Sequence, residues 1–264
     1  MVVDVRISAM SNSPVVIITG SSSGIGKATA IKFAKQHYRI SLSGRDEDAI
    51  AEVVKECEAA GAQGVTTTMG DLRDSSVARD LVEHTIKEFG QLDVLVNSAG
   101  ILVTGSVEEC DMKNYDKVFD VNVRSVIQLT KFAIPHIIKQ QGAIVNVSSV
   151  AGPCPFADVT FYCMSKAALD QFTKCLSLEL APHNVRVNSV NPGVIVSNIH
   201  KRAGMNDAEY KEFLEKGKRT HALGRVGTSD EVANGIYFLA SKESSFTTGH
   251  LLFQDGGRNL MTPR

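Results

Sequence analysis

A tyrosine and a lysine, preceded by two adjacent serines, form the part of this sequence best suited to chemistry. They are Tyr162, Lys166, Ser148 and Ser149. On a helix, the four-residue spacing of Tyr162 and Lys166 places the phenol and the ammonium one turn apart on the same face. A nearby cation favours the phenolate and lowers the pKa of the phenol from its usual value of about 10. Tyr162 is therefore predicted to give a proton to, or take one from, a substrate oxygen.

A tyrosine and a lysine at this spacing also occur by chance on amphipathic helices, so further support is needed. A proton donor for a carbonyl requires a hydride source, and the start of the chain offers a dinucleotide site. Residues 15–19 are an apolar run typical of a strand buried in a parallel sheet. Gly20, Gly24 and Gly26 follow, ahead of a helical pattern, and glycines let the backbone approach a pyrophosphate at a helix N-terminus. A glycine-rich turn without a ligand is the alternative interpretation.

The end of the second predicted strand, residues 39–43, bears on the choice of cofactor, because the adenosine ribose would lie there. A carboxylate at this place would bind the ribose hydroxyls of NAD. The chain instead has Arg45, and a guanidinium suits a 2′-phosphate, so NADP (NADPH) is the favoured cofactor. Two acidic residues follow Arg45, so NAD stays possible, and an exposed Arg45 at a helix start is the alternative.

Strands and helices alternate along the whole chain. This order predicts an α/β fold, a doubly wound parallel sheet of the Rossmann-like type with about seven strands, helices on both faces and a single domain. Residues 197–224 are polar and weakly helical, which is typical of a mobile cover over a site. The expected strands are 15–19, 39–43, 65–69, 92–97, 142–149, 185–190 and 251–254, and the longest expected helices are 75–89, 112–140, 161–181 and 228–240.

Three residues have interpretations that the sequence leaves open or qualifies. Asp71, after the third strand, would face the adenine amino group or cap the helix that starts at Ser75. Asn122 lies inside the long helix 112–140, where asparagine is not favoured, so it either faces solvent or serves a role that the helix does not need. Pro135 predicts a kink later in the same helix.

The composition argues against several classes of partner. Lys and Arg number 28 and Asp and Glu 29, without a block of one sign, so no nucleic-acid or membrane surface is predicted. Five scattered cysteines and histidines without ligand spacing predict reduced thiols, a cytoplasmic protein and no metal site. Residues 1–13 lack the apolar core of a secretion signal and are predicted to be an N-terminal extension to a catalytic domain over 14–264, and no run is long enough for a transmembrane helix.

Taken together, these motifs resemble the single-domain short-chain dehydrogenases/reductases from Val15 to Gly257. The resemblance implies that Tyr162 is the general acid/base, that Lys166 lowers its pKa and holds the nicotinamide ribose, and that Asn122 helps to anchor a water in a proton relay. It also implies a serine that polarises the substrate oxygen, and Ser149 fits because it lies 13 residues before Tyr162. The matching stretches are TGSSSGIG from Thr19, DL at Asp71, NSAG from Asn97, Asn122, SSVAG from Ser148, YCMSK from Tyr162, NPG from Asn191 and DGG from Asp255.

The resemblance further implies a set of cofactor-binding residues. Two places depart from the usual family pattern, Ser98 in the NSAG stretch and Ser197 after the Pro-Gly turn, and both keep a small polar group. The backbone of Ile195 would hold the carboxamide. Besides Tyr162 and Lys166, the predicted set is Gly20, Ser22, Ser23, Gly24, Ile25, Gly26, Arg45, Asp71, Leu72, Asn97, Ala99, Gly100, Pro192, Gly193, Ile195 and Ser197.

The expected activity is NADP(H)-dependent hydride transfer between nicotinamide and a carbonyl or secondary alcohol. Apolar residues after the serines predict a hydrophobic ketone; they are Cys154, Pro155, Phe156, Val159 and Phe161. The alternatives are an NAD-dependent secondary alcohol dehydrogenase and a non-catalytic dinucleotide sensor or scaffold. The resemblance also suggests a homotetramer, or a homodimer, built from helices 112–140 and 161–181.

Overall fold

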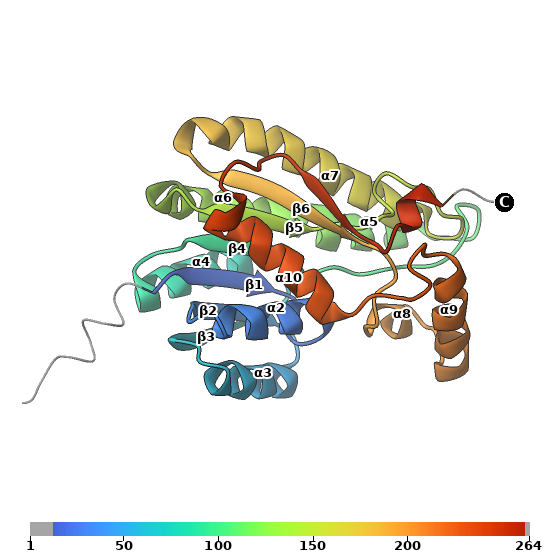
Figure 1. Ribbon diagram of the computed structural model, residues 1–264, viewed down its shortest axis with the longest axis horizontal. Coiled ribbons are helices and arrows are strands. Elements are labelled where there is room, and N and C mark those ends of the chain that lie inside the picture. The colour runs from blue at the N-terminus through green and yellow to red at the C-terminus, as the bar shows by residue number, and fades with distance from the viewer. Residues whose placement is uncertain (1–12, 262–264) are drawn as a thin grey trace, which may run out of the picture.

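One parallel sheet of seven strands organises residues 13–261, the part of the chain described by the computed structural model (Figure 1). The strand order is β3-β2-β1-β4-β5-β6-β7, and every neighbouring pair is parallel. The order reverses between β1 and β4, and this switch point opens a crevice at the carboxyl ends of the strands. The strands are β1 Val15–Thr19, β2 Arg39–Gly44, β3 Gly64–Met69, β4 Val94–Asn97, β5 Ala143–Val147, β6 Arg186–Pro192 and β7 Leu251–Gln254.

Helices cover both faces of the sheet, which is why β1, β4 and β5 are buried at every position. One core lies under α2, α3 and α10 and includes Phe33, Ile50 and Ile236. The other lies under α4, α6 and α7 and includes Leu81 and Leu129. The predicted α/β fold is confirmed. The helices are α2 Gly24–Ala34, α3 Glu47–Ala59, α4 Ser75–Phe89, α5 Met112–Phe119, α6 Ser125–Gln140, α7 Thr160–Leu180, α8 Ile199–Arg202, α9 Asp207–Arg219 and α10 Ser229–Ala240.

The helix predicted over 112–140 is interrupted by a π-helical turn, Asp120–Arg124, between α5 and α6. The backbone N–H of Ser125 bonds the carbonyl oxygen of Asp120 across this turn. Asn122 lies in the middle of it and is fully buried, so the interpretation that it faces solvent is wrong. Single π turns occur frequently at functional sites. The helix continues through Pro135, which lies inside α6.

The segment predicted to cover the site contains two helices, α8 and α9, which pack against each other (Figure 1). Asn206 caps α9, and its side chain and that of Glu209 form a reciprocal capping box. The Tyr210 hydroxyl on α9 bonds both the N–H and the carbonyl oxygen of Ser197, at 3.1 and 2.9 Å. These bonds fix α9 to the chain that leaves β6.

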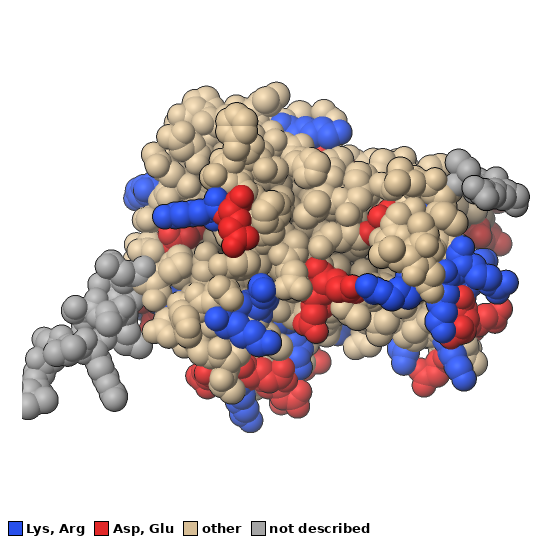
Figure 2. All heavy atoms as spheres, in the orientation of Figure 1, with Lys and Arg blue, Asp and Glu red and all other residues tan. Residues whose placement is uncertain are grey.

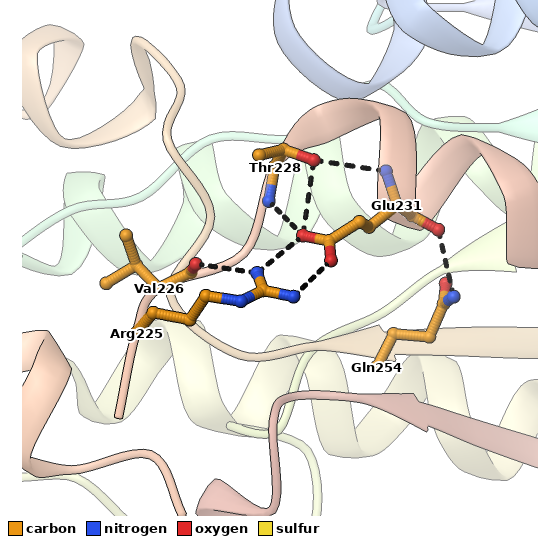
Figure 3. Close-up of polar contacts among 5 residues, drawn as sticks. All are labelled: Arg225, Val226, Thr228, Glu231 and Gln254. Atoms are coloured by element: carbon orange, nitrogen blue, oxygen red, sulfur yellow. Dashed lines mark hydrogen bonds and ion pairs between the residues drawn. The ribbon is translucent and has the colours of Figure 1, made fainter. Parts of the chain in front are cut away.

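The start of α10 joins the end of this cover to the sheet (Figure 3). Thr228 caps the helix and accepts a hydrogen bond from the N–H of Glu231, whose carboxylate accepts from the backbone N–H of Thr228. Arg225 donates to both carboxylate oxygens of Glu231, at 2.9 and 2.6 Å. These bonds hold the pKa of Glu231 down to about 2. Gln254 of β7 donates to the carbonyl oxygen of Glu231.

The surface carries charges of both signs. Figure 2 shows them intermixed on the lower part of one face, whereas the upper part, over α7 and β7, carries few. Among residues 13–261, no helix combines the length and apolar character that a bilayer crossing requires.

Replacement of Thr228 by alanine is expected to lower the free energy of unfolding by about 1 kcal/mol, because the first turn of α10 loses its side-chain cap. Urea denaturation followed by circular dichroism measures this change. Thr228→Ser keeps the hydroxyl and serves as the matched control, with an expected loss well below that of the alanine variant. Equal losses in the two variants would show that the threonine methyl group, and not the cap, is responsible.

Candidate active site

A cavity of about 830 Å³ runs along the carboxyl ends of the strands, at the switch point between β1 and β4. Its volume lies within the range of small-molecule and cofactor sites. Its walls come from the segments that follow strands β1 to β7 and from the cover. No group of three or more metal-ligating side chains occurs in the described part of the chain.

The glycine-rich turn after β1 has the shape that a pyrophosphate requires. Gly20 has a φ of +63°, and a Cβ there would lie 2.8 Å from the Cα of Ala99. A Cβ on Gly26 would clash with the carbonyl oxygen of Gly20. The turn is therefore closed tightly against the end of β4, and only glycine fits at both places. The backbone N–H groups at the start of α2 are then available to an anion.

Two arginines gather at the ribose end of the cavity. Arg73 donates twice to one carboxylate oxygen of Asp71, at 3.0 and 2.7 Å, and Arg45 lies 3.9 Å from the same oxygen. The bond from Arg73 lowers the pKa of Asp71, so this carboxylate stays ionised. The side chain of Asp74, and not that of Asp71, caps α4. The alternative in which Asp71 caps this helix is therefore wrong. Arg73 was not predicted, although it directly follows the Asp71-Leu72 motif.

The Ser43 hydroxyl adds a second polar feature at this end. Ser43 lines the cavity, its Oγ is buried, and this oxygen has no hydrogen-bond partner among residues 13–261. An unpartnered buried hydroxyl beside two guanidinium groups fits a polar ligand such as a ribose phosphate.

Three of the four residues predicted to be catalytic come together on the cavity wall, and Asn122 is the exception. The helix α7 begins at Thr160, so Tyr162 and Lys166 lie one turn apart, and the Lys166 Nζ is 5.6 Å from the centre of the Tyr162 ring. Tyr162, Lys166 and Ser149 all line the cavity. The Ser149 Oγ accepts a hydrogen bond from the N–H of Ala151 at 3.1 Å. Ser148 instead donates to the backbone carbonyl of Lys166, which supports α7.

Burial is the largest cause of the pKa shifts of Tyr162 and Lys166. It raises the pKa of Tyr162 to about 12, and the Ser149 hydroxyl opposes this shift only in part. Burial also lowers the pKa of Lys166 to about 8. In this fold burial outweighs the lowering of the Tyr162 pKa that was expected from Lys166, so the predicted fall in that pKa is not seen. The Lys166 ammonium donates its hydrogen bond to the carbonyl oxygen of Val147, at 2.8 Å, and not to the phenol.

A buried carboxylate supports this arrangement. Asp170 lies one helical turn after Lys166, and its charge opposes the fall in the Lys166 pKa. The amide of Asn191 donates to both carboxylate oxygens of Asp170, at 3.0 and 3.2 Å, and to the carbonyl oxygen of Ser149, at 3.0 Å. Asp170 thus joins α7 to the end of β6 and to the serine that faces the cavity.

Two predicted site residues, Asn122 and Asn97, do not line the cavity. The Asn122 amide exchanges two hydrogen bonds with the backbone of Ile101 and donates to Ser165, so its side chain fixes the loop after β4. The role of Asn122 in water binding stays a prediction. Asn97 was predicted to contact the cofactor, but its side chain donates to Asn146 and Thr130 inside the fold.

The remaining predicted cofactor-binding residues lie on the cavity wall. They are Gly20, Ser22, Ser23, Gly24, Ile25, Gly26, Arg45, Asp71, Leu72, Ala99, Gly100, Tyr162, Lys166, Pro192, Gly193, Ile195 and Ser197.

The wall expected to hold the substrate is partly as predicted. Phe156 and Val159 line the cavity, but Cys154, Pro155 and Phe161 do not. Further apolar lining comes from residues that the sequence reasoning missed, on the loop after β4 and on the cover: Ile101, Leu102, Val103, Ile199 and Phe213. Arg258 was also missed. Its place just after the carboxyl end of β7 was a usable signal, since ligands bind at those ends.

Comparison with known proteins agrees with this geometry. A family model described as enoyl-(acyl carrier protein) reductase matches residues 20–259. The 3-oxoacyl-[acyl-carrier-protein] reductase FabG of Thermotoga maritima is 37% identical over 245 residues, which are 92% of this chain and 96% of that protein. The meso-2,3-butanediol dehydrogenase of Serratia marcescens is 31% identical over 246 residues, or 93% and 94% of the two chains.

A solved structure shows the same likeness in three dimensions. It is a short-chain dehydrogenase/reductase of unknown function from Caenorhabditis elegans, determined with cofactor, with 34% identity and a TM-score of 0.89 over 96% of this chain and 97% of that one. The family expected from the motifs is confirmed. The chain belongs to the short-chain dehydrogenase/reductase family and is an NAD(P)-dependent enzyme that acts on alcohol and carbonyl groups.

Proposed function

We propose that the protein reduces the carbonyl group of a largely apolar ketone with NADPH. The observation that carries this proposal is the placement of Tyr162 and Ser149 on the cavity wall, with the Lys166 ammonium 5.6 Å from the centre of the Tyr162 ring, in a cavity that Arg45 and Arg73 also line. A phenol with its ordinary pKa of about 10 keeps its proton at neutral pH, burial raises the pKa of Tyr162 further, and a reductase needs that proton.

The residues of the chain have distinct tasks in this reaction. The bound cofactor would supply the hydride to the carbonyl carbon. The Tyr162 hydroxyl gives its proton to the oxygen, which is far more basic as an alkoxide than a phenolate is. The Ser149 hydroxyl donates a hydrogen bond to the same oxygen, and the Lys166 ammonium favours the negative charge that develops nearby. The glycine turn after β1 and the start of α2 hold the pyrophosphate.

The ribose end of the cavity favours NADP over NAD. The guanidinium groups of Arg45 and Arg73 share the one carboxylate of Asp71, and the buried Ser43 hydroxyl in the same cavity wall has no partner in the described residues. A 2′-phosphate would satisfy both features. The alternative is an NAD-dependent alcohol dehydrogenase. The Tyr162 hydroxyl serves either enzyme as acid or base, so the residues around the ribose decide between the two cofactors.

An apolar substrate fits the side of the cavity near Tyr162. Val103, Phe156, Val159, Ile199 and Phe213 line it. The named substrates of the related proteins differ, a 3-oxoacyl group in one and a small diol in another, so they leave the choice open.

Exposed apolar side chains on the outer faces of the long helices support a homotetramer or homodimer. Met112 of α5, Ile127 of α6, and Met164 and Leu178 of α7 are exposed apolar side chains, with Leu178 76% exposed. Few charges cover the visible face of α7 (Figure 2). Burial of these side chains against a second copy of the chain would remove them from water.

Replacement of Tyr162 by phenylalanine is expected to lower kcat for ketone reduction by roughly a hundredfold to ten-thousandfold, because the proton donor is lost. NADPH binding, measured by fluorescence titration, is expected to stay within about threefold of the wild type, since the hydroxyl contributes one hydrogen bond at most. The activity is measured from the NADPH absorbance with a panel of apolar ketones and one sugar.

Tyr115→Phe is the matched control, because Tyr115 packs against Phe119 and Phe161 outside the cavity. Turnover of the sugar alone would exclude the apolar substrate, and a fully active Tyr162→Phe variant would exclude the mechanism.

Replacement of Arg45 by aspartate is expected to remove a preference for NADPH over NADH of about tenfold or more, because a phosphate contact is exchanged for repulsion. Fluorescence titration with both cofactors measures the ratio, and Arg73→Asp is expected to act in the same direction. Lys55→Asp makes the same charge change on the exposed face of α3, away from the cavity, and is expected to keep the wild-type ratio. A wild-type protein that binds NADH as well as NADPH would favour the NAD-dependent dehydrogenase.

The rate of carbonyl reduction is expected to fall as the pH rises through about 8. Burial lowers the pKa of Lys166 to about that value, so its ammonium is present below this pH and is lost above it, while Tyr162 keeps its proton. The measurement is kcat/KM for the ketone between pH 6 and 10. Arginine keeps its charge over this range, so the fall is expected to move to higher pH in a Lys166→Arg variant that retains activity. A wild-type profile that is flat to pH 10 would contradict the role of the ammonium.

A further inference from the structure

Three cationic side chains in the cavity wall are not used by the proposed reaction, and of these Lys117 and Arg202 are exposed whereas Arg258 is half-buried. Arg258 follows the turn Asp255-Gly256-Gly257 at the carboxyl end of β7 and is half-buried. The carboxylate of Asp255 accepts hydrogen bonds from the N–H groups of Gly257 and Asn259, at 3.0 and 2.7 Å. These bonds fix the turn, so the start of the Arg258 side chain is held in place.

The guanidinium of Arg258 has few partners. It lies over the ring of Phe156, 4.9 Å from its centre, and one nitrogen donates to the Thr220 hydroxyl at 2.9 Å. No carboxylate oxygen within residues 13–261 lies within 4 Å of it, and its other side-chain donors have no hydrogen-bond partner in that range. Burial lowers its pKa, and the nearby charge of Asp255 opposes this shift only in part. A half-buried cation of this kind gains from a ligand that brings a negative charge.

The contacts of Phe156 place Arg258 on the substrate side of the cavity. The carbonyl oxygen of Phe156 accepts a weak hydrogen bond from the thiol of Cys163, which is the residue after Tyr162. The ring of the same phenylalanine contacts Arg258. Phe156 thus links the guanidinium to the first turn of α7, the helix that carries Tyr162.

A histidine on the cover lies near the same place. His200 of α8 lines the cavity and packs against the ring of Phe213, with centres 4.2 Å apart. Burial lowers the pKa of His200, and the charge of Arg258 lowers it further, so the two side chains are within electrostatic reach. An anion between them would bond to Arg258 and favour protonation of His200.

We propose that Arg258, assisted by His200, binds a carboxylate of the substrate, and that the substrate is therefore an oxo acid with an apolar body. The apolar part lies against Phe156 and Phe213, the carbonyl group reaches Tyr162, and the carboxylate pairs with the planar guanidinium. This inference rests on the proposed function and makes its substrate class more specific. Carboxylate and guanidinium match in geometry, whereas a neutral ketone of equal size leaves the cation without a partner.

The test compares a carboxylic acid with its ester on the complex with oxidised cofactor, where an oxo compound binds without being reduced. The probes are 4-oxo-4-phenylbutanoate, its methyl ester, and the homologous acids with longer chains, and calorimetry gives their dissociation constants. The wild-type protein is expected to bind the best acid about tenfold or more tightly than its ester. Added salt is expected to weaken the binding of the acid and to leave the binding of the ester unchanged.

Variants show whether Arg258 is the cause. Arg258→Gln is expected to reduce the preference for the acid to less than about threefold, and Arg258→Lys is expected to keep part of it, since the charge remains. Arg219→Met removes an exposed cation of α9 outside the cavity and is expected to keep the wild-type preference. If Arg258→Gln does not fold, Arg258→Lys and the salt dependence of the wild type still decide the matter.

Other results would overturn the inference. They are equal binding of acid and ester by the wild type, a preference that persists in Arg258→Gln, and no binding of any acid in the series. Turnover with reduced cofactor separates this failure from that of the proposed function. A protein that reduces both ester and acid with equal KM is a reductase without the carboxylate site. A protein that binds the acid through Arg258 but reduces neither probe keeps the site, and the proposed reduction is then wrong.

Discussion

The position of the Lys166 ammonium in the interior of the fold is the constraint on which the rest of the site depends. A buried charge is costly, and here the cost appears as a pKa lowered to about 8. The Val147 carbonyl and the charge of Asp170 offset part of it. Asp170 is itself buried and needs the two hydrogen bonds from Asn191, whose amide also holds the carbonyl oxygen of Ser149. Ser149 and Lys166 of the cavity wall are therefore held by one continuous set of buried polar contacts.

A second set of buried amides extends this support beneath the cavity. Asn97 of β4 donates to Asn146 of β5, and Asn146 donates to Thr173 of α7, at 2.9 Å each. Asn122 makes a second link to α7, because its side chain bonds both the N–H of Ile101, in the loop after β4, and the Ser165 hydroxyl. Buried hydrogen bonds between side chains are few in most proteins and specify one arrangement. Here they set where α7 lies on the strands, and so where Tyr162 stands relative to the cavity.

The sequence revealed the fold more fully than the site, for physical reasons. Buried parallel strands and glycine turns leave local patterns, so β1, β7 and α4 have the bounds that were predicted, and the mid-helix Asn122 was recognised as unusual. The cap of α4 by Asp74 is local and was missed, whereas the true contacts of Asn97 and the contacts of Arg258 with Thr220 and Phe156 depend on segments far apart in the chain. The sign of the Tyr162 pKa shift also depends on them, because desolvation by the whole fold outweighs a lysine one turn away. Spacing shows which groups are neighbours, but not how much water reaches them.

The same exclusion of water connects catalysis with recognition. Apolar walls keep the Tyr162 proton in place, and they also strengthen the attraction between the Arg258 guanidinium and an anion, because charges interact more strongly where the effective dielectric constant is low. Phe156 connects the two places, since its ring covers Arg258 and its carbonyl oxygen accepts a weak hydrogen bond from the thiol of Cys163, the residue after Tyr162. A purely apolar ketone would use the first effect and leave the second unused. An oxo acid uses both, which reconciles an apolar wall with a cation placed in it.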